Sequence, residues 1–191
     1  IKNILYTSSM FGNKGYGFKV NITNTFAMFG DLLHHSYIFE SIGNAVMISA
    51  VIIGVLLILF GKFNSNWKLY AIISLFLVMV PGFSYVYSIA YMLIPLVAFL
   101  NEKKTRKSDY IYLLLFILQF GLFIAKKDEL FSQFEGSELA LNITTLIESV
   151  VLLLMMAMLY LDGIFTTFKS YKGKKILHIP TKAVARVAMA R

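Results

Sequence analysis

Glu148 is the ionisable residue with the most unusual surroundings in this sequence, because it interrupts an apolar run from about Leu139 to Leu161. A charge near the middle of a bilayer is costly, so such residues normally face other helices or a water-filled cavity. Thr145 and Ser149 add further polar groups beside it. We predict that Glu148 faces the protein interior. There it either holds helices together through hydrogen bonds or binds a polar group of a ligand.

A second group of polar residues, Ser84, Tyr85, Tyr87 and Tyr91, follows the dipeptide Pro81-Gly82. Proline followed by glycine predicts a turn, and tyrosine favours the membrane–water interface. Tyrosine and serine hydroxyls can hydrogen-bond sugar hydroxyls, and the rings can stack on a sugar ring. These four residues are therefore candidates for substrate binding. The alternative is an ordinary belt of interfacial aromatic residues.

A metal site is the third possibility, and it rests on Asp31, His34, His35 and Glu40. Asp31 and His35 share a face if one helix continues through them, but His34 points about 100° away. The set lacks the His-x3-His spacing of a strong zinc signal. We assign no metal, no cofactor and no catalytic residue, since a phosphate-binding glycine loop, a Ser/His/Asp set and a nucleophile elbow are also missing from the sequence.

The composition indicates which elements position these residues. Of the 191 residues, 58% are hydrophobic and 15% are charged, and the mean hydropathy is +0.72. An ordinary soluble domain is roughly 45–50% apolar and about 25% charged. This balance excludes a soluble enzyme and indicates an integral membrane protein. The absence of cysteine also excludes a disulfide scaffold and zinc sites built on thiolates.

The apolar runs predict an all-α, polytopic membrane bundle, since a helix needs roughly 20 apolar residues to cross a bilayer. We expect five transmembrane helices, at 41–60, about 68–80, about 86–100, 110–125 and about 139–161. Before them, Ile22, Phe26, Phe29 and Leu33 recur at steps of three and four, with Asn21 or Thr23 placed to cap the start. This spacing predicts a short amphipathic helix, lying on the membrane surface or packed on the rest of the protein.

The distribution of basic residues predicts the orientation. The 61–68 loop, the 101–109 loop and the segment after Leu161 hold 2 + 4 + 7 = 13 Lys and Arg, whereas the first 40 residues and the 126–138 loop hold 3 + 2 = 5. Cytoplasmic loops carry the excess of basic residues. We therefore expect an external segment 1–40, a membrane domain 41–161 and a basic cytoplasmic tail 162–191. The net charge of +8 then reflects topology and contact with membrane lipid, with no nucleic-acid partner.

The stretch WKLYAIISLFLVMVPGFSYVYSIAYMLIPLVAFLNEK, from Trp67 to Lys103, resembles the C-terminal part of bacterial membrane glycosyltransferases of the GT-C fold. The closest group is glycosyltransferase family 87, the polyprenyl-phosphate-mannose-dependent type. The resemblance rests on the proline and aromatic-Ser turn, the Tyr-rich span and the ending Phe99-Leu100-Asn101-Glu102-Lys103. The stretches Gly17–Asn24 and Asp162–Lys175 also look similar, whereas the sequence after Lys175 departs from the family.

The resemblance implies transfer of a sugar from a polyprenyl-phosphate carrier to an acceptor on the outer face of a bacterial plasma membrane. In such enzymes the catalytic acid lies in the first external loop, and no residue here matches that motif. Because the chain begins with Ile1 on a polar segment, we expect it to be the C-terminal portion of a longer protein, inactive by itself. The alternatives are a transporter or flippase fragment, with Glu148 and the Pro81-Gly82 break along a path, or a non-catalytic membrane subunit.

Overall fold

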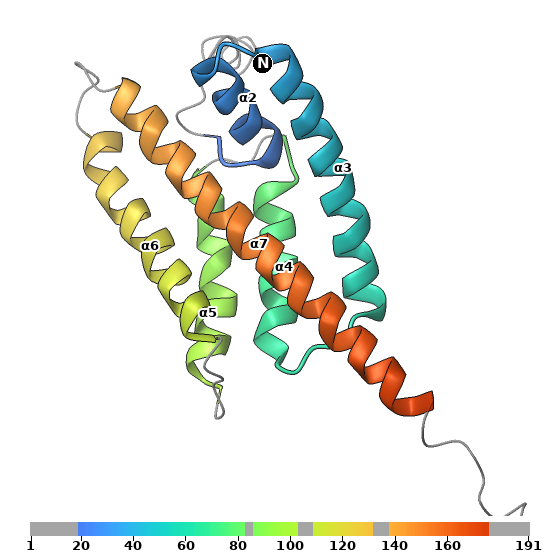
Figure 1. Cartoon of the computed structure of the whole chain (residues 1–191). Helices are drawn as coiled ribbons and strands as arrows, with labels where there is room; N and C mark the ends of the chain where they lie inside the picture. The colour runs from blue at the N-terminus through green and yellow to red at the C-terminus, as the bar shows by residue number, and fades with distance from the viewer. Residues whose placement is uncertain (1–18, 83–85, 103–108, 132–137, 176–191) are drawn as a thin grey trace, which may run out of the picture.

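The computed structural model describes residues 19–82, 86–102, 109–131 and 138–175, and it is all-helical there (Figure 1). The helices, in chain order, are α2 (Ile22–Leu32), α3 (Ser36–Phe60), α4 (Asn66–Met79), the 3-10 helix η2 (Val86–Met92), α5 (Leu93–Leu100), α6 (Asp109–Phe131) and α7 (Glu138–Lys175). α7 runs diagonally along the whole bundle, with α2 beside its N-terminal part at one end. The opposite end is called the Lys68 end below, because α4 begins there.

The short helix α2 begins as the sequence predicts. The Oδ1 atom of Asn21 accepts a hydrogen bond from the backbone N–H of Asn24 at 2.8 Å, which caps the helix. The helix ends at Leu32, and the chain then turns through His34, whose φ is 57°. α2 packs on α3 and on α7, and Ile22 is completely buried. α2 therefore contacts the rest of the protein, and its position relative to a membrane stays a prediction. Asp31 and His35 do not lie on one continuous helix.

A row of small residues lets α3 approach its neighbours closely. Gly43, Ala50 and Gly54 are buried on this helix, whereas most of its larger side chains point outward. A Cβ atom on Gly54 would lie 2.5 Å from the hydroxyl of Tyr160, which itself donates a hydrogen bond to the backbone carbonyl of Ala50 at 2.9 Å. Small residues four apart are the usual means by which membrane helices pack backbone to backbone. The close approach of α3 to α7 therefore depends on Gly54 having no side chain.

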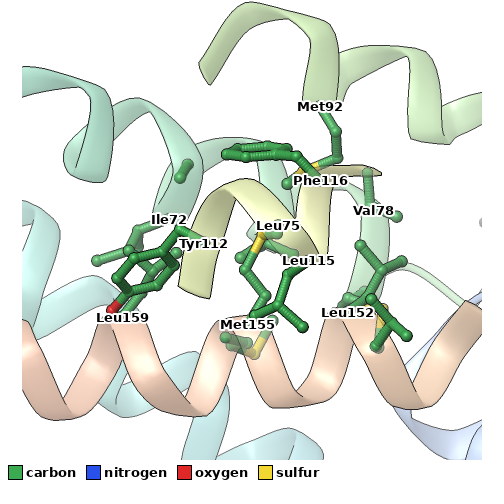
Figure 2. Close-up of a cluster of buried hydrophobic side chains, with 14 of the residues drawn as sticks. Ile72, Leu75, Val78, Met92, Tyr112, Leu115, Phe116, Leu152, Met155 and Leu159 are labelled. Carbon is green, nitrogen blue, oxygen red and sulfur yellow. The ribbon is translucent and has the colours of Figure 1, made fainter. Parts of the chain in front are cut away.

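The core forms around α4, which lies between α3, α5 and α7 and close to η2. Figure 2 shows apolar side chains of α4, η2, α6 and α7 meeting in one cluster. Its labelled members are Ile72, Leu75, Val78, Met92, Tyr112, Leu115, Phe116, Leu152, Met155 and Leu159. Because α4 contributes from several of its faces, it has only a narrow outward stripe at Tyr70, Ile73 and Leu77.

Among the described residues, two helical segments, α3 and the part Thr145–Lys172 of α7, are long and apolar enough to cross a membrane. Only 22% and 33% of their most apolar windows are buried, so neither resembles the enclosed core helix of a soluble protein. The helical segments Asn66–Met79, Ser88–Leu100 and Asp109–Leu122 are apolar but shorter. α7 also continues to Lys175, beyond the expected end of the fifth span at Leu161.

We predict that Gly54→Leu destabilises the bundle by about 1–3 kcal/mol, because the new side chain would push Tyr160 and Phe76 away from α3. The matched control is Gly121→Leu on α6, where an added Cβ atom meets nothing within 4 Å. Thermal unfolding in detergent, followed by helical circular dichroism, measures the difference. Equal unfolding temperatures for the two variants would show that the close contact at Gly54 is not required.

Candidate functional site

A buried ion cluster, here called the ion triad, joins three helices at the Lys68 end. The ammonium of Lys68 lies 3.2 Å from a carboxylate oxygen of Asp109 and 2.9 Å from one of Asp162. Lys68 and Asp109 are buried, whereas the side chain of Asp162 is 30% exposed. Lys68 stands in the first turn of α4, where the helix dipole disfavours a cation, so the two carboxylates supply the compensating charge.

Aromatic rings cover the ion triad on the bundle side. The ammonium of Lys68 lies 5.4 Å from the ring centres of both Trp67 and Tyr112, a cation–π arrangement. Trp67 in turn meets the rings of Phe99 and Tyr112 edge-on, with centroid separations of 5.0 and 5.2 Å. These contacts bring α5 into the same cluster. The ammonium is therefore paired and covered, so the ion triad acts as a structural clamp rather than as a source of a free amine.

Sequence reasoning missed the ion triad. It treated Lys68 as a loop residue at the start of a span, Asp109 as a span boundary and Asp162 as part of the tail. Each residue alone fits a solvated position at a membrane edge. One signal in the sequence could have revealed it. Lys68, Asp109 and Asp162 each border an apolar run on the predicted cytoplasmic side, where side chains of different helices can form ion pairs.

Glu148 faces the protein interior, as the sequence predicts, and its exposed fraction is 0%. The side-chain amide of Gln119 on α6 donates a hydrogen bond to its Oε1 atom at 3.3 Å. Thr145 and Ser149 are completely buried on the same helix. Gln119 and Glu148 thus connect α6 to α7 well inside the bundle. This arrangement agrees with the structural role, and the ligand role of Glu148 stays a prediction.

The structure describes only part of the tyrosine-rich segment that holds the candidate substrate-binding residues. Ser84 and Tyr85 lie outside the described residues, and so does the side chain of Tyr87. Tyr91 lies in η2 and is 50% exposed, so its ring is accessible from outside the bundle. The preceding turn lies beside the start of α2, where the side-chain amide of Asn21 donates a hydrogen bond to the carbonyl of Gly82 at 3.4 Å. The structure does not bring Tyr91 and Glu148 into one exposed site, because Glu148 is enclosed.

The metal hypothesis gains no support from the geometry. Within the described ranges, no three His, Cys, Asp or Glu side chains gather closely enough to hold a metal ion. Asp31, His34, His35 and Glu40 are all exposed, and the turn after Leu32 separates the first of them from α3.

Comparisons with family models, with curated proteins and with solved structures find no match to this chain. The ion triad and the Gln119–Glu148 hydrogen bond are both buried polar contacts between helices. Together they join α4 and α6 to α7 at two places. Of the two predicted binding residues whose side chains the structure describes, Glu148 is enclosed and Tyr91 is accessible.

We predict that Lys68→Met destabilises the protein by about 3 kcal/mol, because it leaves the carboxylate of Asp109 buried without its cation. The expected loss lies at the lower end of the range for buried pairs, since Asp162 reaches solvent. The triple variant Lys68→Met, Asp109→Asn, Asp162→Asn should recover most of this loss, because it removes all three charges together. Thermal unfolding in detergent measures both.

Lys169→Met is the matched control for this prediction. Lys169 is an exposed lysine on α7, and its removal should change the free energy of unfolding by no more than about 0.5 kcal/mol. If the single and triple variants were equally destabilised, the electrostatic account of the clamp would be wrong, and the loss would come from packing of the lysine stem.

Proposed function

We propose that this chain is the membrane-embedded portion of a glycosyltransferase that transfers a sugar from a polyprenyl-phosphate carrier on the outer face of a membrane. The observation that carries the membrane part is an inverted polarity: several charged and amide side chains are buried inside the bundle, while many large apolar side chains are exposed on its outside. The carrier part rests on the resemblance of the Trp67–Lys103 stretch to family 87 enzymes and on the exposure of Tyr91.

The inverted polarity involves buried polar side chains on α4, α6 and α7, and exposed apolar side chains on these helices and on α3 and α5. Lys68, Asp109, Gln119 and Glu148 are each no more than 1% exposed. Large apolar side chains at least half exposed include Ile48, Ile52, Leu59, Ile94, Val97, Ile117, Leu154 and Phe165. In water, such a surface would favour association with any apolar partner. In a bilayer the same surface meets hydrocarbon, and the enclosed polar groups avoid the cost of contact with lipid.

Five spans fit this surface if α3, α4, η2 with α5, α6 and α7 each cross once. With 14 residues, α4 is about 21 Å long, less than the ~30 Å of a bilayer core. Its enclosure by other helices makes this length acceptable, since lipid would touch only the stripe at Tyr70, Ile73 and Leu77. α2 then lies at the outer interface.

The orientation follows from the basic residues at the Lys68 end, which we propose is cytoplasmic. The charge of Lys68 is already neutralised within the ion triad, so it contributes little to the topology. Leaving it out changes the split of Lys and Arg from 13 against 5 to 12 against 5. The excess on this side remains large enough to set the orientation. The Pro81-Gly82 turn then faces outward, at the depth where a carrier phosphate and its sugar would lie.

Cysteine labelling tests the membrane part, and the chain has no native cysteine. In intact cells, we expect Asp31→Cys to react with an impermeant maleimide, and Asn64→Cys to react only after permeabilisation. Both residues are exposed: Asp31 lies on α2, before α3 begins, and Asn64 lies after α3 ends. Ile117→Cys, 60% exposed on α6, should resist labelling in either case, because a thiol in hydrocarbon stays protonated.

Two results would contradict this topology. Rapid labelling of Ile117→Cys in permeabilised cells would show that α6 faces water and would overturn membrane insertion. Labelling of Asn64→Cys but not Asp31→Cys in intact cells would leave the bundle in the membrane with the reverse orientation.

Carrier binding is tested with a photo-crosslinkable polyprenyl-phosphate-mannose analogue in membranes that contain the chain. Tyr91→Ala should lower the crosslinked yield by roughly two- to tenfold, because the exposed ring no longer packs against the sugar. Tyr70→Ala is the matched control, since Tyr70 is 44% exposed on α4 and Tyr91 is 50% exposed. Glu148→Gln should leave the yield unchanged because the carboxylate is enclosed. Equal yields for all variants and the parent would contradict a carrier site at the turn.

A further inference from the structure

An apolar groove opens on the outside of the bundle at the Lys68 end, between the last turns of α3 and the C-terminal half of α7. Its walls include Ile53, Leu56 and Phe60 of α3 and Ile164, Thr167 and Phe168 of α7. The groove has a volume of about 270 Å³, just below the ~300–1,000 Å³ of ordinary ligand pockets. From Ile53 to Gly61 it follows α3 for about 12 Å, which suits a narrow, extended chain.

The groove wall has almost no free hydrogen-bond donor or acceptor for water. Thr167 is the polar member among these six wall residues, and its hydroxyl is already engaged. It accepts a hydrogen bond from the backbone N–H of Lys62 at 2.9 Å and donates one to the carbonyl of Gly163 at 2.6 Å. Leu56, Phe60 and Phe168 are each more than half exposed along the opening. An apolar occupant would therefore displace water from this surface without breaking a hydrogen bond.

A fixed cation stands where the groove reaches the Lys68 end. The backbone of Lys62 is held on both sides, because its N–H donates to Thr167 and its carbonyl accepts from the hydroxyl of Thr166 at 2.6 Å. The ammonium of Lys62 lies 5.4 Å from the ring centre of Tyr171, one turn beyond Phe168. Lys172 follows on the same part of α7 and is exposed. The apolar groove thus ends near two exposed lysines, and the backbone of Lys62 is held in place by hydrogen bonds.

We propose that this groove binds one acyl chain of an anionic phospholipid, with the lipid phosphate near Lys62 and Lys172. The inference rests on the proposed membrane insertion but not on the proposed carrier site, which lies at the opposite end of the bundle. Charge complementarity selects the occupant: hydrocarbon fits the groove, and a negative headgroup fits the lysines at its mouth. A basic residue near an anionic lipid surface favours binding by about fivefold.

The test uses the full 191-residue chain in phosphatidylcholine vesicles, with a trace of spin-labelled phosphatidylglycerol or phosphatidylcholine. Electron paramagnetic resonance then measures the fraction of each labelled lipid that the protein immobilises. We expect phosphatidylglycerol to be preferred, and Lys62→Gln to reduce that preference by about fivefold. The matched control is Lys169→Gln, because at about 100° per residue Lys169 points away from the face of α7 that carries Ile164 and Phe168.

A second pair of variants tests the chain-binding part. Leu56→Trp should fill the groove and reduce immobilisation of both lipids, whereas Leu59→Trp, on an exposed position of α3 outside the groove wall, should not. Both positions are exposed, so neither change should prevent folding, which circular dichroism checks. If Leu56→Trp unfolds the protein, the comparison of Lys62→Gln with Lys169→Gln still decides.

Three results would overturn the proposal. The first is an equal loss of the preference for phosphatidylglycerol in Lys62→Gln and Lys169→Gln, because the preference would then reflect only the general positive charge of the surface. Unchanged immobilisation in Leu56→Trp would exclude the groove as the binding place. Stronger displacement of the label by polyprenyl phosphate than by unlabelled phosphatidylglycerol would assign the groove to the carrier instead. The cysteine-labelling test of membrane insertion and the crosslinking test at Tyr91 are separate experiments, and their results do not depend on these outcomes.

Discussion

The buried ammonium of Lys68 is the constraint to which the rest of the bundle is fitted. A cation removed from water requires compensating charge within hydrogen-bond reach, and one carboxylate from α6 and one from α7 supply it. Because these acids are far apart in sequence from Lys68, the pairing fixes how three helices meet at one end. Trp67 extends the constraint to α5 through its edge contact with Phe99. The position of α4 at the centre follows from this arrangement.

Two further contacts between helices act at greater distance from the ion triad. The hydrogen bond from Gln119 to Glu148 holds α6 to α7, and the hydroxyl of Tyr160 bonds the backbone of α3 beside Gly54. In both contacts a polar side chain bonds to a group on another helix. In hydrocarbon, where helices gain nothing from hydrophobic association, such bonds and the close packing of small residues are what hold a bundle together. α7 takes part in all of them, and it is also the longest described helix.

Because the polar contacts lie inside the bundle, its outer surface is largely apolar. The two ends of the bundle carry different polar groups. At the α2 end, the capped helix α2 is joined to the Pro81-Gly82 turn by the hydrogen bond from Asn21 to Gly82, and Tyr91 of η2 is half exposed. The Lys68 end carries the ion triad inside and exposed lysines outside, with an apolar groove leading to them. The carrier lipid proposed for one end and the phospholipid proposed for the other would each meet apolar side chains along the bundle and a polar group at its end.

The sequence by itself determined the helical class, the approximate positions of the apolar helices, a capped helix start at Asn21 or Thr23 and the inward position of Glu148. These properties are local, because they depend on the length of an apolar run, on a capping side chain and on the cost of exposing one carboxylate to lipid. Only the tertiary structure decided that Lys68 is buried between Asp109 and Asp162, and that Gln119 is the partner of Glu148. It also decided that α2 ends at Leu32 and packs on α3, and that α7 continues past Leu161.

Which acid reaches which base depends on the rotation and offset of helices that are distant in sequence. Those quantities are set by packing at residues such as Gly54, where contact with Tyr160 fixes how closely two helices approach.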